Sequence, residues 1–315
     1  MTKNSKLIIK EALSLGLTID VISEDHHLFT ISKNGKSVLI YELFSLLSDP
    51  ATEAYRLSKD KNIMYILWER NGIPFPRYHH FKNFKEFEEQ AQTLKFDYPV
   101  ITKETSGSKS TNVYMDIRSF SELEKTTGKY SRSFVVQEMA PGNEYRLLMY
   151  KGELLGALEM HPPQVVGNGT STVGKLIEDA NTKRAISIKV SRQVMLTLEK
   201  SGLTLESIPE KGAVILLQKN SRLAEGGSST DCTDRVNEEI AALAWKASRA
   251  TNLNLGGVDL ICEDISRPPE TQKVLFLEVN TYPDLSIHYF PTEGKPRHVI
   301  RPILQDLFSL EKNTL

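Results

Sequence analysis

Residues 257–280 read GVDLICEDISRPPETQKVLFLEVN, and the rest of the chain is best interpreted outward from this stretch. Its two apolar runs, GVDLICE and KVLFLEV, flank a polar loop over 264–272 and predict two β-strands. Because side chains alternate along a strand, Glu278 and Asn280 are expected on one face. If the strands pair as an antiparallel hairpin about the centre of the loop, Asp259 lies opposite Glu278. The other face of the second strand then takes Leu275, Leu277 and Val279.

Asp259, Glu278 and Asn280 would then meet between apolar walls. Carboxylate and amide oxygens are the hard donors that Mg²⁺ prefers, and waters and phosphate oxygens serve as its further ligands. The alternative is that these residues are polar groups at a strand edge, held by hydrogen bonds. The spacing alone leaves both interpretations open.

The 315-residue chain is balanced in composition and charge. Lys and Arg number 39 against 40 Asp and Glu, the formal net charge is −1, and hydrophobic residues make up 40%. Such a chain can bury a core, which excludes disorder of the whole, and it lacks the basic excess of a nucleic-acid-binding surface. No run approaches the ~18 apolar residues of a membrane span, and MTKNSKLIIK lacks the apolar stretch of a secretory signal. Two cysteines, Cys232 and Cys262, cannot build a disulfide framework, so we expect a cytoplasmic protein.

Upstream of residue 140, helix-like and strand-like segments alternate, which indicates an α/β or α+β architecture. The first 50 residues predict a helix and a β-ribbon with an Asn34–Gly35 turn. A helix is expected over 58–70, capped by Ser58 and ended by Asn71–Gly72. Its apolar stripe would hold Ile63, Ile66, Leu67 and Arg70.

Two capping boxes, Asn83 with Glu86 and Ser119 with Glu122, predict the starts of two further helices. Strands are expected around these helices, at 98–103, 111–117 and 133–138. Downstream, EYRLLMY and LLGALEM predict a hairpin, and helices are expected within 172–200 and 237–251, with the strand GAVILLQ between them.

Three further segments carry residues suited to binding. Lys103 ends the strand YPVITK before the Ser/Gly-rich turn TSGSKSTN, where a lysine and loop N–H groups could meet phosphate oxygens. Glu144 and Arg146 share a strand face and could hold ribose hydroxyls and a phosphoryl group. Read alone, Lys103 is better explained as a solvent-facing lysine at a strand end, and Glu144 and Arg146 as a cross-strand ion pair.

The loop SRLAEGGSSTDCTD, with Gly226–Gly227, and a basic cluster near residue 290 are further candidates. That cluster could bind a substrate carboxylate or could be a solvated loop, and it consists of His288, Lys295, Arg297 and His298. No GxGxxG follows the first strand and no GxSxG or HExxH occurs, which removes support for a dinucleotide fold, a serine hydrolase or a zinc protease.

From about residue 50 to 308, the order of motifs resembles that of the ATP-grasp carboxylate–amine ligases. The stretches concerned are SKDKNIMYILWERNGIPFPRY, YPVITKETSGS, VVQEMAPGNEYRLLMYKGELLGALEMHPPQVVGNGTSTVGKLI, RLAEGGSSTDCTDRV, LGGVDLICEDIS and LFLEVNTYPDLSIHYFPTEGKPR. They are most similar to the ATP-grasp region of cyanophycin synthetases and bifunctional glutathione synthetases. The resemblance implies an α+β ATP-grasp fold whose two α+β subdomains clamp ATP. It assigns 1–50 to a truncated pre-ATP-grasp segment and 51–315 to the ATP-grasp domain, with a lid at about 76–138.

The resemblance also implies a role for each matching residue. Lys61 and Lys103 match lysines that contact ATP phosphates, and Arg146 matches the arginine that steadies the phosphoryl group and the acyl phosphate. Lys103 and Arg146 are thus the implied catalytic residues. The implied magnesium ligands are Asp259, Glu278 and Asn280.

The nucleoside end of ATP is implied to lie at four other residues. Gln137 matches an adenine-facing side chain, and Glu138 and Ala140 match the hinge backbone that reads the adenine edge. Glu144 matches the carboxylate that binds the ribose.

By this resemblance the protein is an ATP-dependent ligase with two Mg²⁺ ions, for which Mn²⁺ could substitute. It would join a carboxylate and an amine, from amino acids or a short peptide, through an acyl phosphate. The family likeness also suggests a homodimer. Two alternatives are an altered ATP-grasp protein that binds nucleotide as a sensor or scaffold, and a phosphotransferase.

The chain also departs from the family pattern. Ser110 and Asn112 stand where glycines are common in the small phosphate loop. His161 stands where an arginine is frequent, and Gln218 and Arg222 replace an Arg and an Asn before the paired glycines. We also expect neither a following peptide-ligase module nor a preceding glutamate–cysteine ligase module. Substrate identity is therefore not carried over from the named relatives.

Overall fold

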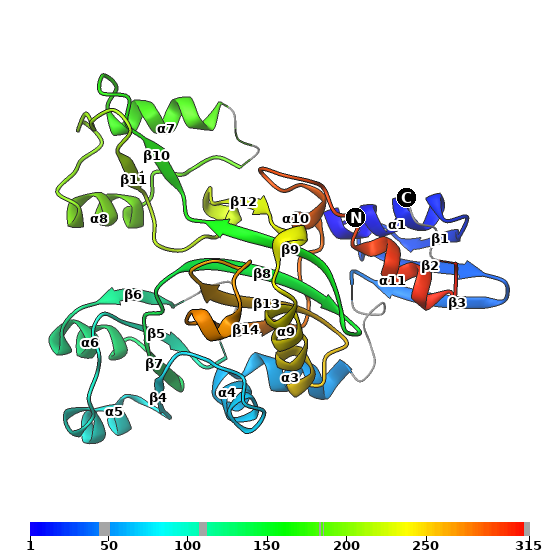
Figure 1. Cartoon of the computed structure of the whole chain (residues 1–315), viewed down its shortest axis with the longest axis horizontal. Helices are drawn as coiled ribbons and strands as arrows, with labels where there is room; N and C mark the ends of the chain where they lie inside the picture. The colour runs from blue at the N-terminus through cyan, green and yellow to red at the C-terminus, as the bar shows by residue number, and fades with distance from the viewer. Residues whose placement is uncertain (44–50, 107–111, 183, 185, 312–315) are drawn as a thin grey trace. The chain divides into compact units, whose positions relative to one another are not determined.

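The computed structural model describes residues 1–43, 51–106, 112–182, 184 and 186–311 (Figure 1). The chain divides into two compact units. Unit one comprises Met1–Ala157, Cys232–Phe290 and Pro296–Leu315, and unit two comprises Leu158–Asp231 and Pro291–Lys295. The fold mixes helices and antiparallel sheets, as expected for an α+β protein.

The N-terminal segment of unit one is a helix followed by a three-stranded antiparallel sheet. It consists of α1 (Lys3–Ser14), β1 (Thr18–Ser23), β2 (Leu28–Lys33) and β3 (Lys36–Tyr41). The predicted turn is confirmed, because Asn34 and Gly35 have φ of 48° and 80°, the left-handed values of a two-residue hairpin. Ile8 and Phe29 share a core with the C-terminal helix α11 (Ile300–Leu307).

A four-stranded antiparallel sheet with its own core occupies most of the predicted lid. Its strand order is β4-β7-β5-β6. The elements are β4 (Tyr78–Phe81), α5 (Phe84–Gln90), η1 (Ala91–Thr93), β5 (Val100–Glu104), β6 (Tyr114–Ile117), α6 (Phe120–Thr127) and β7 (Phe134–Glu138). Both capping boxes are confirmed, since the Asn83 and Ser119 side chains accept from the N–H groups of Glu86 and Glu122. That this part moves as a lid stays a prediction.

The helix predicted over 58–70 is two helices, α3 (Ala51–Lys59) and α4 (Lys61–Arg70). Its predicted cap, Ser58, is wrong, because Asp60 Oδ1 accepts from the N–H groups of Asn62 and Ile63. The predicted end is confirmed at Asn71, followed by Gly72 with φ of 64°.

The predicted stripe on this helix is also wrong. Ile63 and Ile66 are 40% and 43% exposed, whereas the buried residues are Lys61, Met64, Tyr65 and Trp68. These four residues have the same i, i+3, i+4, i+7 spacing as the predicted stripe, but the stripe begins two residues earlier, at Lys61.

The second sheet of unit one has the order β9-β8-β13-β14. Its strands are β8 (Asn143–Tyr150), β9 (Glu153–His161, continuing into unit two), β13 (Leu255–Cys262) and β14 (Leu275–Asn280). Helix α9 (Glu238–Ala250) lies against this sheet (Figure 1), and Ile240, Ala244 and Trp68 are part of its core. Shorter elements of this unit are η3 (Thr233–Arg235), η4 (Pro269–Thr271) and α10 (Ser286–Tyr289).

Unit two holds the end of β9, paired with β12 (Ser228–Asp231), and a two-stranded sheet of β10 (Gln164–Val166) and β11 (Val214–Leu216). Its helices are α7 (Val173–Asn181), α8 (Arg192–Lys200) and η2 (Leu223–Glu225). Val173, Val194 and Leu217 lie in a separate core.

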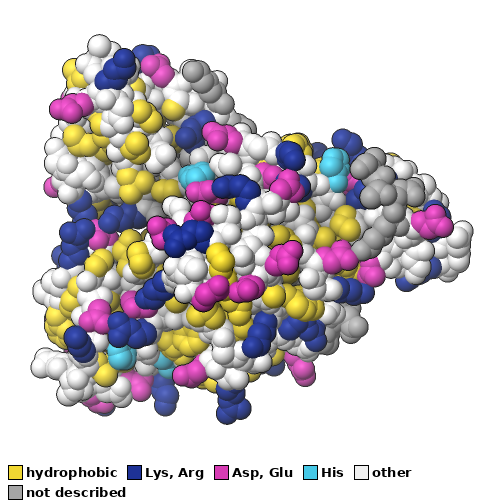
Figure 2. All heavy atoms as spheres, viewed as in Figure 1, with side chains coloured by type: hydrophobic (Ala, Val, Ile, Leu, Met, Phe, Trp, Pro, Cys, Tyr) yellow, Lys and Arg dark blue, Asp and Glu magenta, His cyan; other side chains and the backbone are white. Residues whose placement is uncertain are grey.

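On the face shown in Figure 2, Lys and Arg side chains are interspersed with Asp and Glu, in keeping with the near-zero net charge. None of the described helices combines the length and the apolar character needed to cross a bilayer.

Candidate functional site

Strands β8, β13 and β14 bring the predicted polar residues of unit one together. Asp259 lies opposite Glu278 on one side, as predicted, and opposite Arg146 on the other. Nε and Nη2 of Arg146 each lie 2.5 Å from an Asp259 carboxylate oxygen, a bidentate ion pair. Asn280 Nδ2 donates to Asp259 at 3.2 Å and to Glu278 at 3.4 Å.

The alternation predicted for β14 is interrupted. The register shifts between Asp259 and Leu260, so that Leu260 pairs with Phe276 rather than with Leu277. Phe276 and Val279 therefore lie in the same core, although they are three residues apart. The predicted apolar face of Leu275, Leu277 and Val279 is to that extent wrong, while Glu278 and Asn280 do share a face.

Two lysines add positive charge to this cluster. Lys61, 7% exposed at the first position of α4, places Nζ 3.7 Å from a Glu278 oxygen. Burial raises the pKa of Glu278, but the charges of Lys61, Lys103 and Arg146 outweigh burial and lower this pKa to about 2. Glu278 is therefore ionised at neutral pH.

Burial acts differently on the other charged groups. It raises the pKa of Asp259, which Arg146 opposes. It lowers the pKa of Lys103, which Glu278 and Asp259 oppose. Glu144, two residues from Arg146 on β8, also raises the pKa of Arg146 and Asp259, so its charge acts on the same cluster.

Tyr65, which no sequence motif singled out, links these residues to the four-stranded sheet. Its hydroxyl accepts from Lys103 Nζ at 3.3 Å and from Gln137 Nε2 at 3.0 Å, and it donates to the Leu277 carbonyl at 3.0 Å. The ring is fully buried. The signal that could have found it is the helical spacing from Lys61 to Tyr65, which puts both on one face.

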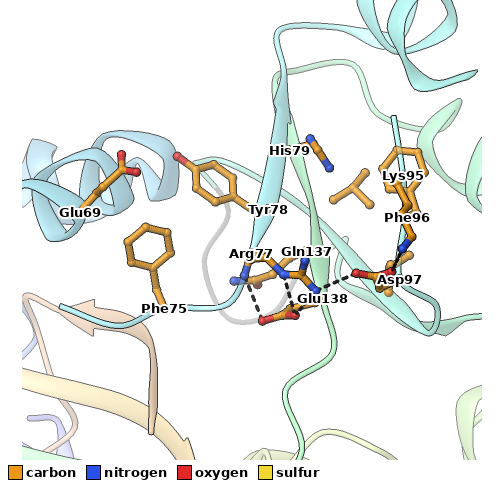
Figure 3. A pocket seen from close by; sticks show the side chains of 12 residues that line it. Glu69, Phe75, Arg77, Tyr78, His79, Lys95, Phe96, Asp97, Gln137 and Glu138 are labelled. Carbon is orange, nitrogen blue, oxygen red and sulfur yellow. Dashed lines mark hydrogen bonds and ion pairs between the residues drawn. The ribbon is translucent and has the colours of Figure 1, made fainter. Parts of the chain in front are cut away.

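Gln137 and Glu138 line a cavity of about 430 Å³ beside β4 (Figure 3). The Glu138 carboxylate accepts from Arg77 and from Lys273, and these contacts lower its pKa although burial raises it. Phe75 and Tyr78 also line this cavity. Ala140, the other predicted hinge residue, is buried.

Three of the residues that depart from the family pattern lie in unit two, and the contacts of His161 and Arg222 are with other residues of that unit. His161 Nε2 lies 3.1 Å from Thr230 Oγ1. Arg222 forms an ion pair with Glu225, and Gln218 is 3% exposed.

The small phosphate loop is described only in part. Ser110 lies outside the described residues. Asn112, with φ of 55°, donates to Glu104 and accepts from the Tyr130 hydroxyl.

The four residues of the predicted basic cluster near residue 290 do not form one site within unit one. His288 is buried, Arg297 pairs with Asp234, and His298 lies 2.6 Å from Glu11. Lys295 belongs to unit two. Cys232 and Cys262 form no disulfide with each other and are buried in the core, which gives no support to a thiol nucleophile.

The donor set of the site fits a magnesium ion. Asp259 and Glu278 offer hard carboxylate oxygens, and Asn280 lies within hydrogen-bond distance of both. To act as a ligand, Asn280 would turn its amide so that the oxygen replaces Nδ2. Among the described residues, no group of three or more His, Cys, Asp or Glu side chains is arranged to hold a metal.

Comparisons with known proteins find relatives that match most of this chain. The cyanophycin synthetase of Nostoc sp. is 32% identical over 269 residues, which cover 82% of this chain and 30% of that protein. The glutathione biosynthesis bifunctional protein of Clostridium perfringens is 26% identical over 330 residues, which cover 97% of this chain and 41% of that protein. The crystal structure of a bifunctional glutathione synthetase from Pasteurella multocida matches with a TM-score of 0.71 at 21% identity, covering 97% of this chain and 44% of that one.

The matched region is only a part of each relative. The chain spans less than half the length of the curated relatives it matches. No protein-family model matches the chain.

Proposed function

The chain belongs to the ATP-grasp family, with cyanophycin synthetases and bifunctional glutathione synthetases among its homologues, and on that premise we propose that it is an ATP- and Mg²⁺-dependent ligase joining a carboxylate to an amine. The observation that carries the proposal is the charge cluster of unit one. Arg146 contacts Asp259, Lys61 contacts Glu278, and Asn280 donates to both carboxylates.

In the proposed reaction, a carboxylate oxygen of the first substrate attacks the γ-phosphorus of ATP, and ADP leaves with the electron pair of the broken P–O bond. The amine then attacks the carbonyl carbon of the acyl phosphate. The C–N bond forms, the C–O bond breaks, phosphate leaves, and the amine loses a proton to yield the amide.

Phosphoryl transfer of this kind needs positioning and charge neutralisation rather than a covalent nucleophile. Lys103 and Arg146 provide fixed positive charges for the phosphoryl oxygens. Asp259, Glu278 and Asn280 would hold two Mg²⁺ ions, or Mn²⁺ in their place, and a bound divalent ion neutralises charge on the phosphate oxygens. The base and ribose would lie at Gln137, the backbone of Glu138 and Ala140, and Glu144.

The substrate class follows from the relatives alone. Their names refer to the synthesis of cyanophycin and of glutathione, and we propose an amino acid or a short peptide for each substrate here. A homodimer is part of the same proposal.

The test is incubation with ATP, Mg²⁺ and pools of amino acids and dipeptides, with ADP and product masses measured. We expect ADP and an adduct whose mass is the sum of two substrates less one water. Lys103→Met should reduce ADP formation about 100-fold, the order of effect seen on removing one transition-state donor. Lys85→Met, a change at a side chain that is 83% exposed, is the matched control and should keep full activity.

The competing functions predict other products. Nucleotide binding without acceptor-dependent ADP release would identify a sensor or scaffold. A stable phosphorylated product without an adduct would identify a phosphotransferase. Either result contradicts the ligase.

A further inference from the structure

We infer that Tyr65 is a positioning residue that fixes the orientation of the Gln137 side-chain amide, and that this orientation selects a nucleobase carrying an exocyclic amino group. The inference deepens the proposed function and rests on it, because it needs a nucleotide whose base faces Gln137.

The Tyr65 hydroxyl has one proton to donate, and its neighbours decide where that proton goes. The Leu277 carbonyl, 3.0 Å away, can only accept. The Lys103 ammonium, 3.3 Å away, can only donate. The proton is therefore committed to Leu277, and the hydroxyl serves as an acceptor toward its other neighbours.

This commitment leaves one orientation for the Gln137 amide, 3.0 Å from the same hydroxyl. If Oε1 faced Tyr65, two acceptors would compete for one proton and a buried acceptor would lack a partner, which is costly. Nε2 must therefore face Tyr65, and Oε1 must point elsewhere. None of the described residues donates a hydrogen bond to Oε1 of Gln137.

An acceptor held in this way distinguishes the two purines. The 6-amino group of adenine donates a hydrogen bond, whereas guanine carries a carbonyl oxygen at the same position, so Oε1 would favour adenine. Gln137 lines the cavity of about 430 Å³, which is large enough for a small ligand group (Figure 3).

The Tyr65 ring is held independently of its hydroxyl. It stacks on Phe75 with ring centroids 5.1 Å apart and packs against Tyr78 at 4.8 Å. Tyr65→Phe keeps these ring contacts and removes only the oxygen. Tyr150→Phe is the matched control, because it also removes only the hydroxyl of a buried tyrosine of unit one, one that lies in another core and donates to Asp306 Oδ2 at 2.6 Å.

The experiment measures Kd for ADP and for GDP, with Mg²⁺, by calorimetry on the full-length wild type and both variants. We expect the wild type to prefer ADP by about tenfold or more, the factor that one hydrogen bond to an otherwise unpaired acceptor supplies. In Tyr65→Phe the preference for ADP over GDP should fall about tenfold, because the Gln137 amide is then free to turn and present Nε2 to guanine. Tyr150→Phe should keep the ADP:GDP ratio of the wild type.

A folded Tyr65→Phe variant with an unchanged ADP:GDP ratio overturns the inference, and so does an equal loss of the ratio in Tyr150→Phe. A wild type that binds both nucleotides equally overturns the inference alone, whereas one that binds neither overturns the proposed function as well. If Tyr65→Phe does not fold, the ¹⁵N-labelled wild type decides. The Gln137 side-chain NH₂, assigned by its absence in Gln137→Met, should be protected from exchange with water, and free exchange contradicts the inference.

Discussion

Breaking the Arg146–Asp259 pair tests the electrostatics of the site directly. In Arg146→Met, the Asp259 side chain, 6% exposed, loses a bidentate partner at 2.5 Å. Removing one member of a buried ion pair costs about 3–5 kcal/mol of unfolding free energy. We expect the lower end of this range, because Asn280 Nδ2 still lies 3.2 Å from the carboxylate and the carboxylate can take up a proton.

The unfolding free energy lost in Arg146→Met should increase as pH rises. Burial raises the pKa of Asp259 and Arg146 opposes this, so without Arg146 the folded-state pKa rises further above the unfolded value. A carboxyl group with a raised folded-state pKa stabilises the fold fully below its unfolded pKa, and that stabilisation is lost as pH rises through the folded value. The deficit of the variant therefore widens between pH 5 and pH 8. The wild-type pKa of Asp259 is about 7, so of a displacement of about two pKa units about one unit, or about 1.4 kcal/mol, develops by pH 8.

The assay is urea unfolding in EDTA at both pH values, followed by the fluorescence of Trp68 and Trp245, which lie in or against the core of the same unit. The control combines Arg146→Met with Asp259→Asn, which removes both charges and should recover most of the loss at pH 8. The reasoning is refuted if the deficit of Arg146→Met is equal at the two pH values, or below about 1 kcal/mol at pH 8.

Three further outcomes are expected. In urea titrations, Lys103→Met should not lower the unfolding free energy, because burial already disfavours the Lys103 charge by lowering its pKa; a clear loss would contradict this. Gly156→Ala should lower the unfolding free energy by about 1–3 kcal/mol in thermal denaturation, since a Cβ there would lie 2.7 Å from Nδ1 of buried His288. Lys273→Met should cost about 0.5 kcal/mol at pH 7, because Lys273 is half exposed. Since its contact lowers the pKa of Glu138, that stabilisation is present above the ordinary carboxyl pKa and is lost as pH falls, so by urea titration the cost should vanish near pH 3.

Short sequence motifs correctly predicted the parts of the fold in which only a few neighbouring residues interact. The capping boxes at Asn83 and Ser119 and the turn at Asn34–Gly35 each satisfy backbone groups within four residues, so the sequence carries the whole interaction. The opposition of Asp259 and Glu278 was also predictable, because the loop centre sets the register of a hairpin.

Interactions between distant segments could not be read in this way. Ser58 and Asp60 are equally good caps by residue type, and which one serves depends on where the preceding helix ends. The bulge in β14 shifts the register by one residue without any glycine or proline to mark it. Tyr65 acts on Leu277, 212 residues away, and only the fold brings them together.

The predicted phosphate-binding cations and metal-binding carboxylates prove to be one another's partners. Arg146 pairs with Asp259, and Lys61 lies beside Glu278, so each buried charge is compensated. On the proposed function, a triphosphate that draws these cations to its oxygens leaves two carboxylates with less compensation. A divalent cation restores that balance, since carboxylates are its preferred ligands. Nucleotide and metal should therefore bind with positive linkage, each reducing the electrostatic cost of admitting the other.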